Sequence, residues 1–237
     1  MKKLAVVAAA VAALGFVTSA YAADMPVKAP YVKAIPAYNW TGFYIGVNGG
    51  GAFGTGYWDY VPPAVTNQNH NISGGLVGGT VGYNWQAPGS NWVFGAEGDW
   101  DWADIHGSTS CPNPAFSCET KTSSLGTFRG RLGYAWSDLL LYGTGGLAWS
   151  RHRAQTVFLT GGAIPPSGTS TNGTTSDVLG YTVGGGLEWG FMPRWSVKLE
   201  GLFVSFPRKS TLVDNALVVS TRDQFGVIRA GLNYRFW

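Results

Sequence analysis

Charged side chains fall into opposed groups on two stretches of the sequence, and their spacing could place them in ion pairs. Glu97, Asp99 and Asp101 alternate with other residues, so in a β-strand they would share one face. Arg129 and Arg131 show the same alternation further along the chain. A guanidinium suits a carboxylate because its N–H donors form a fork, and a buried charge without a partner is costly. Other ionisable residues also lie on the strand face opposite the apolar residues. The predicted set is therefore Glu97, Asp99, Asp101, Arg129, Arg131, Glu188, Lys198, Glu200, Arg229 and Arg235.

Other residue types that could do chemistry give weaker patterns. Cys111 and Cys118 are the only two cysteines, and an even pair in an exported chain predicts a disulfide, whereas a metal site would need two more ligands. Ser150 and His152 share a strand face, a spacing too weak to indicate a lipid-modifying enzyme by itself. Gly49–Gly54 matches a dinucleotide-binding pattern, but no strand–helix unit accompanies it. We therefore expect that the protein is not an enzyme and that it binds neither a metal ion nor a dinucleotide cofactor.

The first residues have the features of an export signal. Lys2 and Lys3 precede a short apolar stretch that ends near Val17, and Ala20-Tyr21-Ala22 fits the small-residue cleavage rule. We expect a signal peptide at 1–22, cleaved after Ala22, followed by a proline-rich periplasmic linker at 23–39. The remaining 40–237 would form the folded domain.

The folded domain must position these residues on strands, because apolar residues from Trp40 onward recur with a period of two. Long polar gaps at 54–71, 104–121, 151–176 and 205–221 alternate with short turns at 87–90, 137–138 and 191–194. This alternation is typical of outer-membrane barrels. The predicted strands are Trp40–Phe53, Ile72–Gln86, Asn91–Ala103, Thr122–Trp136, Leu139–Ser150, Asp177–Gly190, Trp195–Val204 and Arg222–Trp237.

Composition supports this all-β interpretation. Charged residues make up 12% of the chain and 35 of its 237 residues are glycine, so few ions are available to cover a water-soluble surface. After the leader, no apolar run is long enough for a transmembrane helix. The small net charge gives no support for a nucleic-acid partner. A soluble β-sandwich would also alternate, but it would turn its charged face to water.

Tryptophan positions favour the barrel over the sandwich. Barrels in membranes carry aromatic girdles at both interfaces with water. Seven tryptophans fall at predicted short-turn ends and four at or near the long-loop ends. The first group is Trp40, Trp85, Trp92, Trp136, Trp189, Trp195 and Trp237, and the second is Trp58, Trp100, Trp102 and Trp149. We predict an eight-stranded antiparallel transmembrane β-barrel with four long external loops and three short periplasmic turns.

Three segments carry a family resemblance: the run from Tyr38 to Gly51, Gly82-Tyr-Asn-Trp-Gln86, and Arg129-Gly-Arg-Leu-Gly-Tyr134. They resemble the small outer-membrane β-barrel proteins of alphaproteobacteria, known as porin-family or surface-antigen proteins, over about 40–237. The resemblance implies localisation in the outer membrane after export, with lipid and the barrel assembly machinery as partners. The chain's end is similar to the signal that this machinery reads, here Leu232, Tyr234, Phe236 and Trp237.

The predicted fold leaves three functions to compare. The lumen of an eight-stranded barrel is just wide enough to be filled by side chains, so the ionisable set predicts a structural ion-pair network. A passive small-solute channel through the same residues is the first alternative. Some relatives bind hemin, and imidazole can ligate haem iron, so hemin capture by His70, His106 and His152 in the external loops is the second.

Overall fold

The computed structural model describes residues 38–61, 68–110, 116–158, 170–213 and 217–236. These residues form nine β-strands: β1 Gly42–Val61, β2 Gln68–Gln86, β3 Trp92–Ser110, β4 Phe116–Trp136, β5 Leu139–Phe158, β6 Ser170–Met192, β7 Trp195–Ser205, β8 Lys209–Val213 and β9 Leu217–Arg235. The described residues contain no helix long and apolar enough to cross a membrane. The predicted signal peptide and nearly all of the predicted linker lie outside the described residues.

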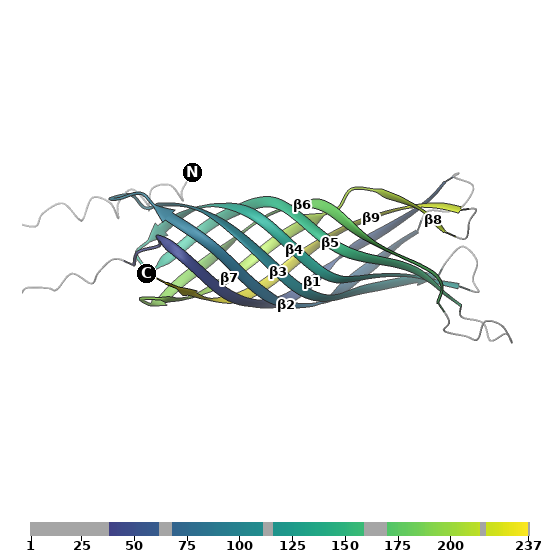
Figure 1. Ribbon diagram of the computed structural model, residues 1–237, viewed down its shortest axis with the longest axis horizontal. Coiled ribbons are helices and arrows are strands. Elements are labelled where there is room, and N and C mark those ends of the chain that lie inside the picture. Colours follow the sequence, from purple (N-terminus) through teal and green to yellow (C-terminus); the bar gives the residue numbers. More distant parts are fainter. Residues whose placement is uncertain (1–37, 62–67, 111–115, 159–169, 214–216, 237) are drawn as a thin grey trace, which may run out of the picture. The chain divides into compact units, whose positions relative to one another are not determined.

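The strands form one closed antiparallel sheet (Figure 1). Each strand from β1 to β6 pairs with the next along the chain, and β1 also pairs with β9, which closes the barrel. β7 and β8 both pair with β9, β7 through Trp195–Ser205 and β8 through Lys209–Val213, so together they form one interrupted strand. The prediction of an eight-stranded antiparallel barrel is therefore confirmed.

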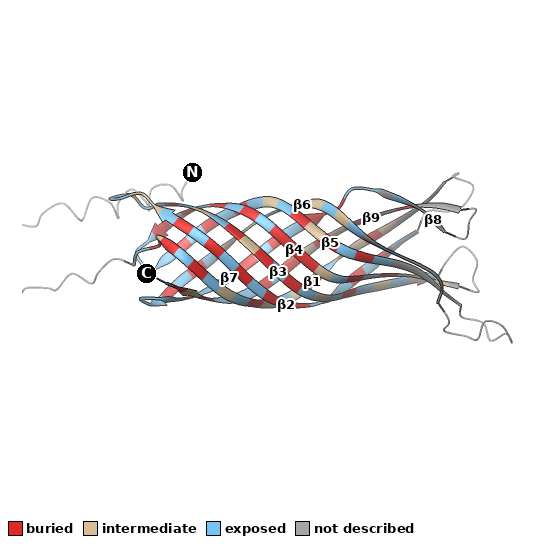
Figure 2. Cartoon of the chain, viewed as in Figure 1, coloured by how far each residue is buried: buried red, intermediate tan, exposed pale blue. Residues whose placement is uncertain are grey.

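Alternation along each strand sorts the side chains between lipid-facing and lumen-facing sides. In β1, Phe43, Ile45 and Val47 are about half exposed or more, whereas Tyr44 and Asn48 between them are buried. Figure 2 shows the same banding of buried and exposed residues along the other strands. We call the outward apolar side chains the apolar belt; it includes Val77, Val81, Trp85, Phe94, Trp100, Phe128, Leu132, Leu141, Leu147, Leu179, Tyr181, Leu187, Leu199, Phe203, Ile228 and Phe236.

The strands run further than the sequence predicts. β1 continues to Val61 and β2 begins at Gln68, so most of the segment 54–71 is paired strand rather than loop. The other three segments predicted to be long loops, 104–121, 151–176 and 205–221, also contain paired strand. Their pairing is between β3 and β4, β5 and β6, and β8 and β9. Their residues are polar, and apolar periodicity does not reveal a strand that has water on its outer side. The barrel therefore continues well past the apolar belt at this end.

The opposite end has short connections, as predicted. Ser137, with φ of 57°, and Asp138 join β4 to β5, and Gly89, with φ of 71°, lies in the turn between β2 and β3. The backbone N–H of Ser90 donates to the carbonyl of Ala87 at 3.0 Å in that turn. These connections leave the inward faces of the strands to determine what fills the lumen.

Candidate functional site

Arg129 of β4 lies at the centre of a group of buried ion pairs inside the barrel. Its guanidinium contacts Glu97 of β3 at 2.5 Å, Asp99 of β3 at 2.8 Å and Glu200 of β7 at 2.8 Å. Glu97 is directly opposite Arg129 in the β3–β4 register, whereas Glu200 reaches it across the lumen. One arginine therefore ties together opposite walls of the barrel.

Arg229 of β9 repeats this arrangement from the other side. It contacts Asp99 at 2.9 Å, Asp101 at 2.8 Å and Glu200 at 2.8 Å. Asp99 and Glu200 are thus shared between Arg229 and Arg129. A bridging carboxylate of this kind holds two like charges near each other without leaving either unpaired.

The remaining members connect the network to β6 and β7. Arg131 contacts Glu188 at 2.7 Å and Glu97 at 3.4 Å, and Lys198 contacts Glu97 at 3.0 Å. All ten predicted residues are buried and belong to this set, which we call the lumen network. It contains five carboxylates and five cations, so its formal charge is zero.

Neutral side chains that are not among the predicted ionisable residues complete the lumen network. The Tyr44 hydroxyl donates to Glu97 and accepts from Arg131, both at 2.8 Å. Thr127 donates to Asp99 at 2.7 Å, and Ser196 donates to Glu188 at 2.6 Å. The Arg131 guanidinium also lies 3.9 Å from the ring centre of Tyr142. All these residues occupy inward positions, so the strand alternation was the signal that could have found them.

An apolar layer lies between the lumen network and the long-strand end. The inward series of β9 shows the order, because Asp223 is followed by the buried Phe225 and Val227 and then by Arg229. We call this group the upper apolar layer; it comprises Ala52, Ile72, Leu76, Ile105, Leu125, Ala148, Leu202, Val204, Phe206, Phe225 and Val227. The sequence predicts a polar lumen, so this buried apolar layer is a difference between the prediction and the structure.

A second apolar group, the lower apolar layer, closes the short-turn end. It comprises Trp40, Val93, Ala135, Leu140 and Tyr142, with Tyr38 packed against it. The interface position predicted for Trp40 is wrong: its side chain is fully buried, and its indole N–H donates to the Ser137 carbonyl at 3.2 Å.

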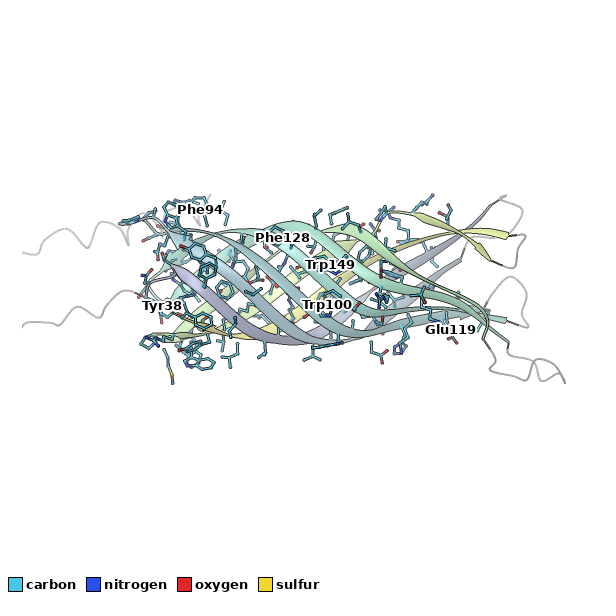
Figure 3. The ribbon with its side chains drawn as sticks, viewed as in Figure 1. Tyr38, Phe94, Trp100, Glu119, Phe128 and Trp149 are labelled. Atoms are coloured by element: carbon cyan, nitrogen blue, oxygen red, sulfur yellow. The ribbon has the colours of Figure 1, made fainter. Side chains whose placement is uncertain are left out.

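Arg235 links the lower apolar layer to the lumen network. Its guanidinium lies 5.0 Å from the rings of both Tyr38 and Trp40, and it donates to the Asn39 carbonyl. Figure 3 labels Tyr38 at this end of the barrel. Residues 38–39 thus contact the barrel, although the predicted linker included them. Cation–π contact with two rings explains why an arginine lies beside apolar groups here.

Polar residues form a separate group above the upper apolar layer, which we call the outer polar cluster: His70, Ser150, His152 and Asp223. His152 Nδ1 lies 2.9 Å from Asp223 Oδ2, and the His152 ring packs edge-on against Phe206. His70 lies on β2 beyond the apolar belt, and burial there lowers the pKa of its imidazole.

The placement of the three histidines in one set of external loops is wrong. His70 and His152 are buried on inward faces of strands, and His106 is exposed on β3. The strands continue past the belt, so alternate residues in these polar segments still point into the barrel. The three imidazoles therefore do not form one surface for a porphyrin. Ser150 is buried in the lumen as well, which keeps it away from lipid outside the wall.

Two predicted site residues lie outside the part of the chain that the structure describes. Cys111 lies outside the described residues, as does Trp237, so the disulfide to Cys118 and the last assembly-signal position stay predictions. Leu232 and Phe236 of that signal lie on the outward face of the barrel. Among the residues that the structure describes, no three His, Cys, Asp or Glu side chains are placed to hold a metal ion.

Proteins with curated descriptions resemble this chain along nearly its whole length. A 31 kDa outer-membrane immunogenic protein of Brucella melitensis is 35% identical, and the match covers 98% of this chain and 99% of the relative. A 22 kDa outer membrane protein of Rhizobium leguminosarum is 29% identical, with 91% and 83% covered. These relatives and the barrel fold together place the chain in the outer membrane.

Solved structures give more distant matches. OprG of Pseudomonas aeruginosa is 13% identical with a TM-score of 0.49, covering 84% of this chain and 97% of OprG. Neisserial surface protein A is 14% identical with a TM-score of 0.41, covering 83% and 98%. The model of the family described as "Outer membrane protein beta-barrel domain" matches residues 8–236. The chain therefore belongs to this family of outer-membrane β-barrel proteins.

Proposed function

We propose that this protein is a structural outer-membrane barrel whose lumen does not conduct ions, and which presents polar strand ends at the cell surface. One observation carries the proposal: the lumen network lies between two apolar layers. An ion would have to displace paired charges in the network and also cross the upper and lower layers, whose mainly apolar side chains are poor substitutes for its water shell.

The neutrality of the lumen network supports this role over that of a channel. A selectivity filter offers a permeant ion sites that it can enter and leave. Here the Arg129 guanidinium is fully buried, and its N–H groups already contact Glu97, Asp99 and Glu200. The polar strands beyond the belt fit a surface role, as does the Brucella relative's description as immunogenic.

Planar-bilayer recording tests the proposal. Protein folded in detergent is inserted into a bilayer, and its insertion is checked by the mobility of the unboiled protein on a gel. We expect no conductance steps from the wild type, whereas a known porin in the same bilayers gives them. Reproducible open steps, absent from a mock preparation and altered by Arg129→Gln, would show that the lumen conducts and would overturn the proposal.

A further inference from the structure

Within the described residues, the barrel wall is interrupted where β6 loses its second partner. β6 pairs with β7 from Met192 to Tyr181, where Tyr181 is opposite Ser205. Beyond Ser205 the chain passes through Phe206–Arg208 into β8, which pairs with β9 and not with β6 (Figure 1). The part of β6 from Ser170 to Gly180 is therefore paired with β5 alone. Any closure of the wall at this height must come from side chains.

Side chains of the outer polar cluster connect the two sides of this interruption from inside the barrel. His152 of β5 is opposite Ser176, within the part of β6 that lacks a second partner. Its Nδ1 lies 2.9 Å from Oδ2 of Asp223, which belongs to β9, the strand that pairs with β8. Phe206, where the chain leaves β7, contacts both residues. Its ring centre lies 5.2 Å from that of His152, and its backbone N–H donates to the Asp223 carbonyl at 3.0 Å.

A second imidazole approaches the same carboxylate from β2. Neither ring nitrogen of His70 has a hydrogen-bond partner, and Asp223 Oδ1 has none either. A Cβ on Gly56, which is opposite His70 in the β1–β2 register, would lie 2.9 Å from His70 Nε2 and 3.1 Å from Asp223 Oδ1. Both atoms therefore lie beside the same bare backbone position. The Asp223 carboxylate thus has His152 at one oxygen and His70 near the other.

The charge of this cluster depends on how many of its imidazoles are protonated, because other inward side chains around it are neutral. Among the described side chains, these inward neighbours are Thr120, Thr122, Ser150 and Ser220. The charged and titratable residues of the same strands occupy the alternate, outward positions: Asp104, His106, Glu119, Lys121, Arg151, Arg153, Asp177 and Arg222. One imidazolium is therefore balanced by Asp223, and a second has no counter-charge.

Burial determines the direction of the pH effect. Burial lowers the pKa of the His70 imidazole, and the negative charge of Asp223 opposes this effect in part. An open arrangement, in which His70 reaches water, binds more protons than the closed one at the same pH. The closed arrangement is therefore stable well above the ordinary imidazole pKa of about 6.5 and loses stability as the pH falls below it.

We propose that the outer polar cluster is an acid-sensitive latch, which closes the interrupted wall near neutral pH and releases it when both His70 and His152 are protonated. A buried charge without a partner is costly, so the second imidazolium favours opening. The wall parts between β6 and β8, because no backbone pairing resists separation there. The upper apolar layer separates the latch from the lumen network, so the release changes the long-strand end and leaves the lumen filled.

Amide hydrogen exchange of the full chain, folded in lipid vesicles, tests the proposal by mass spectrometry. Exchange is measured at about pH 7.5 and about pH 5, on either side of the imidazole range, and each rate is divided by its intrinsic value at that pH. Peptides covering 175–180 and 206–208 report on the interruption, and a peptide covering 44–48 reports on the apolar belt. The variants are His70→Gln, His70→Phe and the matched control His106→Gln, which removes an exposed imidazole.

We expect the wild type and His106→Gln to lose protection at the interruption by at least about tenfold in acid, with the belt unchanged. Both His70 variants should keep their protection in acid, because one imidazolium remains balanced by Asp223. Equal wild-type protection at the two pH values would overturn the proposal. So would an equal loss in the belt, or a full acid loss in a His70 variant. Unboiled gel mobility verifies that each variant is folded.

Asp223→Asn changes the latch in the opposite direction. Without the carboxylate, even the first imidazolium lacks a counter-charge and the contact with His152 is weaker, so protection at the interruption should fall at a higher pH than in the wild type. A series of pH values locates the midpoint of the loss in both proteins. An unchanged midpoint would show that Asp223 does not hold the latch, and would overturn the proposal.

Discussion

At the scale of single residues, burial and charge pairing in the lumen depend on each other. Arg129, Arg229 and their carboxylate partners are nearly inaccessible to water, so each charge relies on its neighbours for the interactions that water would supply. Five carboxylates and five cations satisfy this requirement together. Removing one member leaves partners that have no substitute, because the apolar layers above and below contain no ion to replace it.

Arg129→Met is therefore expected to lower the free energy of unfolding by about 3–5 kcal/mol, the cost of breaking a buried ion pair. Urea unfolding of the barrel in lipid vesicles measures this change. The matched variant Arg151→Met removes an exposed arginine from its contact with Asp177 and should change stability by about 1 kcal/mol or less. Similar losses in both variants would contradict the account of the lumen network.

At the scale of strands, inward glycines let neighbouring strands approach closely enough to form a narrow barrel. A Cβ on Gly50 of β1 would lie 2.6 Å from Arg229 Cα and 2.7 Å from Arg229 Cβ. These atoms belong to β9, the strand that closes the barrel against β1. Outward Gly201 of β7 differs, because a Cβ there would meet nothing within 4 Å. The glycine excess thus has a structural use on the inward face.

Gly50→Ala should destabilise the closing β1–β9 pairing, with a loss of about 1–3 kcal/mol, because the new methyl group overlaps backbone that cannot rotate away. Gly201→Ala, the same change at an open position, should leave stability nearly unchanged. The folded fraction is read from the unboiled band on a gel after refolding across a urea series. If the Gly50→Ala variant had the same folded fraction as the wild type across the urea series, this account would be contradicted.

At the scale of the whole molecule, the barrel reverses the arrangement of a water-soluble protein: large apolar side chains of the apolar belt face outward, and charged side chains face the lumen. Val77, Val81 and Trp85 of β2 are about half exposed or more, whereas Thr80 between them is buried. In water such a surface would cause protein molecules to associate, whereas in a bilayer its side chains contact the lipid acyl chains. The belt fixes the barrel's depth, and the strands beyond it are polar enough to stay in water.

Val81→Arg places a charge near the middle of the belt and should cost about 2–4 kcal/mol in lipid vesicles. Asn71→Arg adds the same side chain to the outward face of the same strand beyond the belt, where the expected cost is about 0–1 kcal/mol. Unfolding in urea from vesicles compares the two variants. Equal costs would mean that residue 71 also lies in lipid, and would move the membrane boundary along β2.

The fold was predictable from the sequence because its two determinants are local. The alternation of Phe43, Ile45 and Val47 with Tyr44 is visible without the structure, and it sets which face meets lipid. The opposed charges of Glu97 and Arg129 were visible in the same way. Strand length was less predictable, because the polar ends of β1 and β2 carry no apolar pattern, although their backbones pair.

The sequence by itself determined the eight-stranded alternation, the sorting of charge inward and the outer-membrane fold, because each follows from the two-residue period of a strand. Only the tertiary structure decided how the lumen is filled. Trp40 enters the lumen, Arg129 reaches Glu200 across it, and Phe225 joins an apolar layer because closure brings distant strands face to face. The interruption between β6 and β8 was likewise decided by pairing, since no residue pattern shows which neighbour a strand lacks.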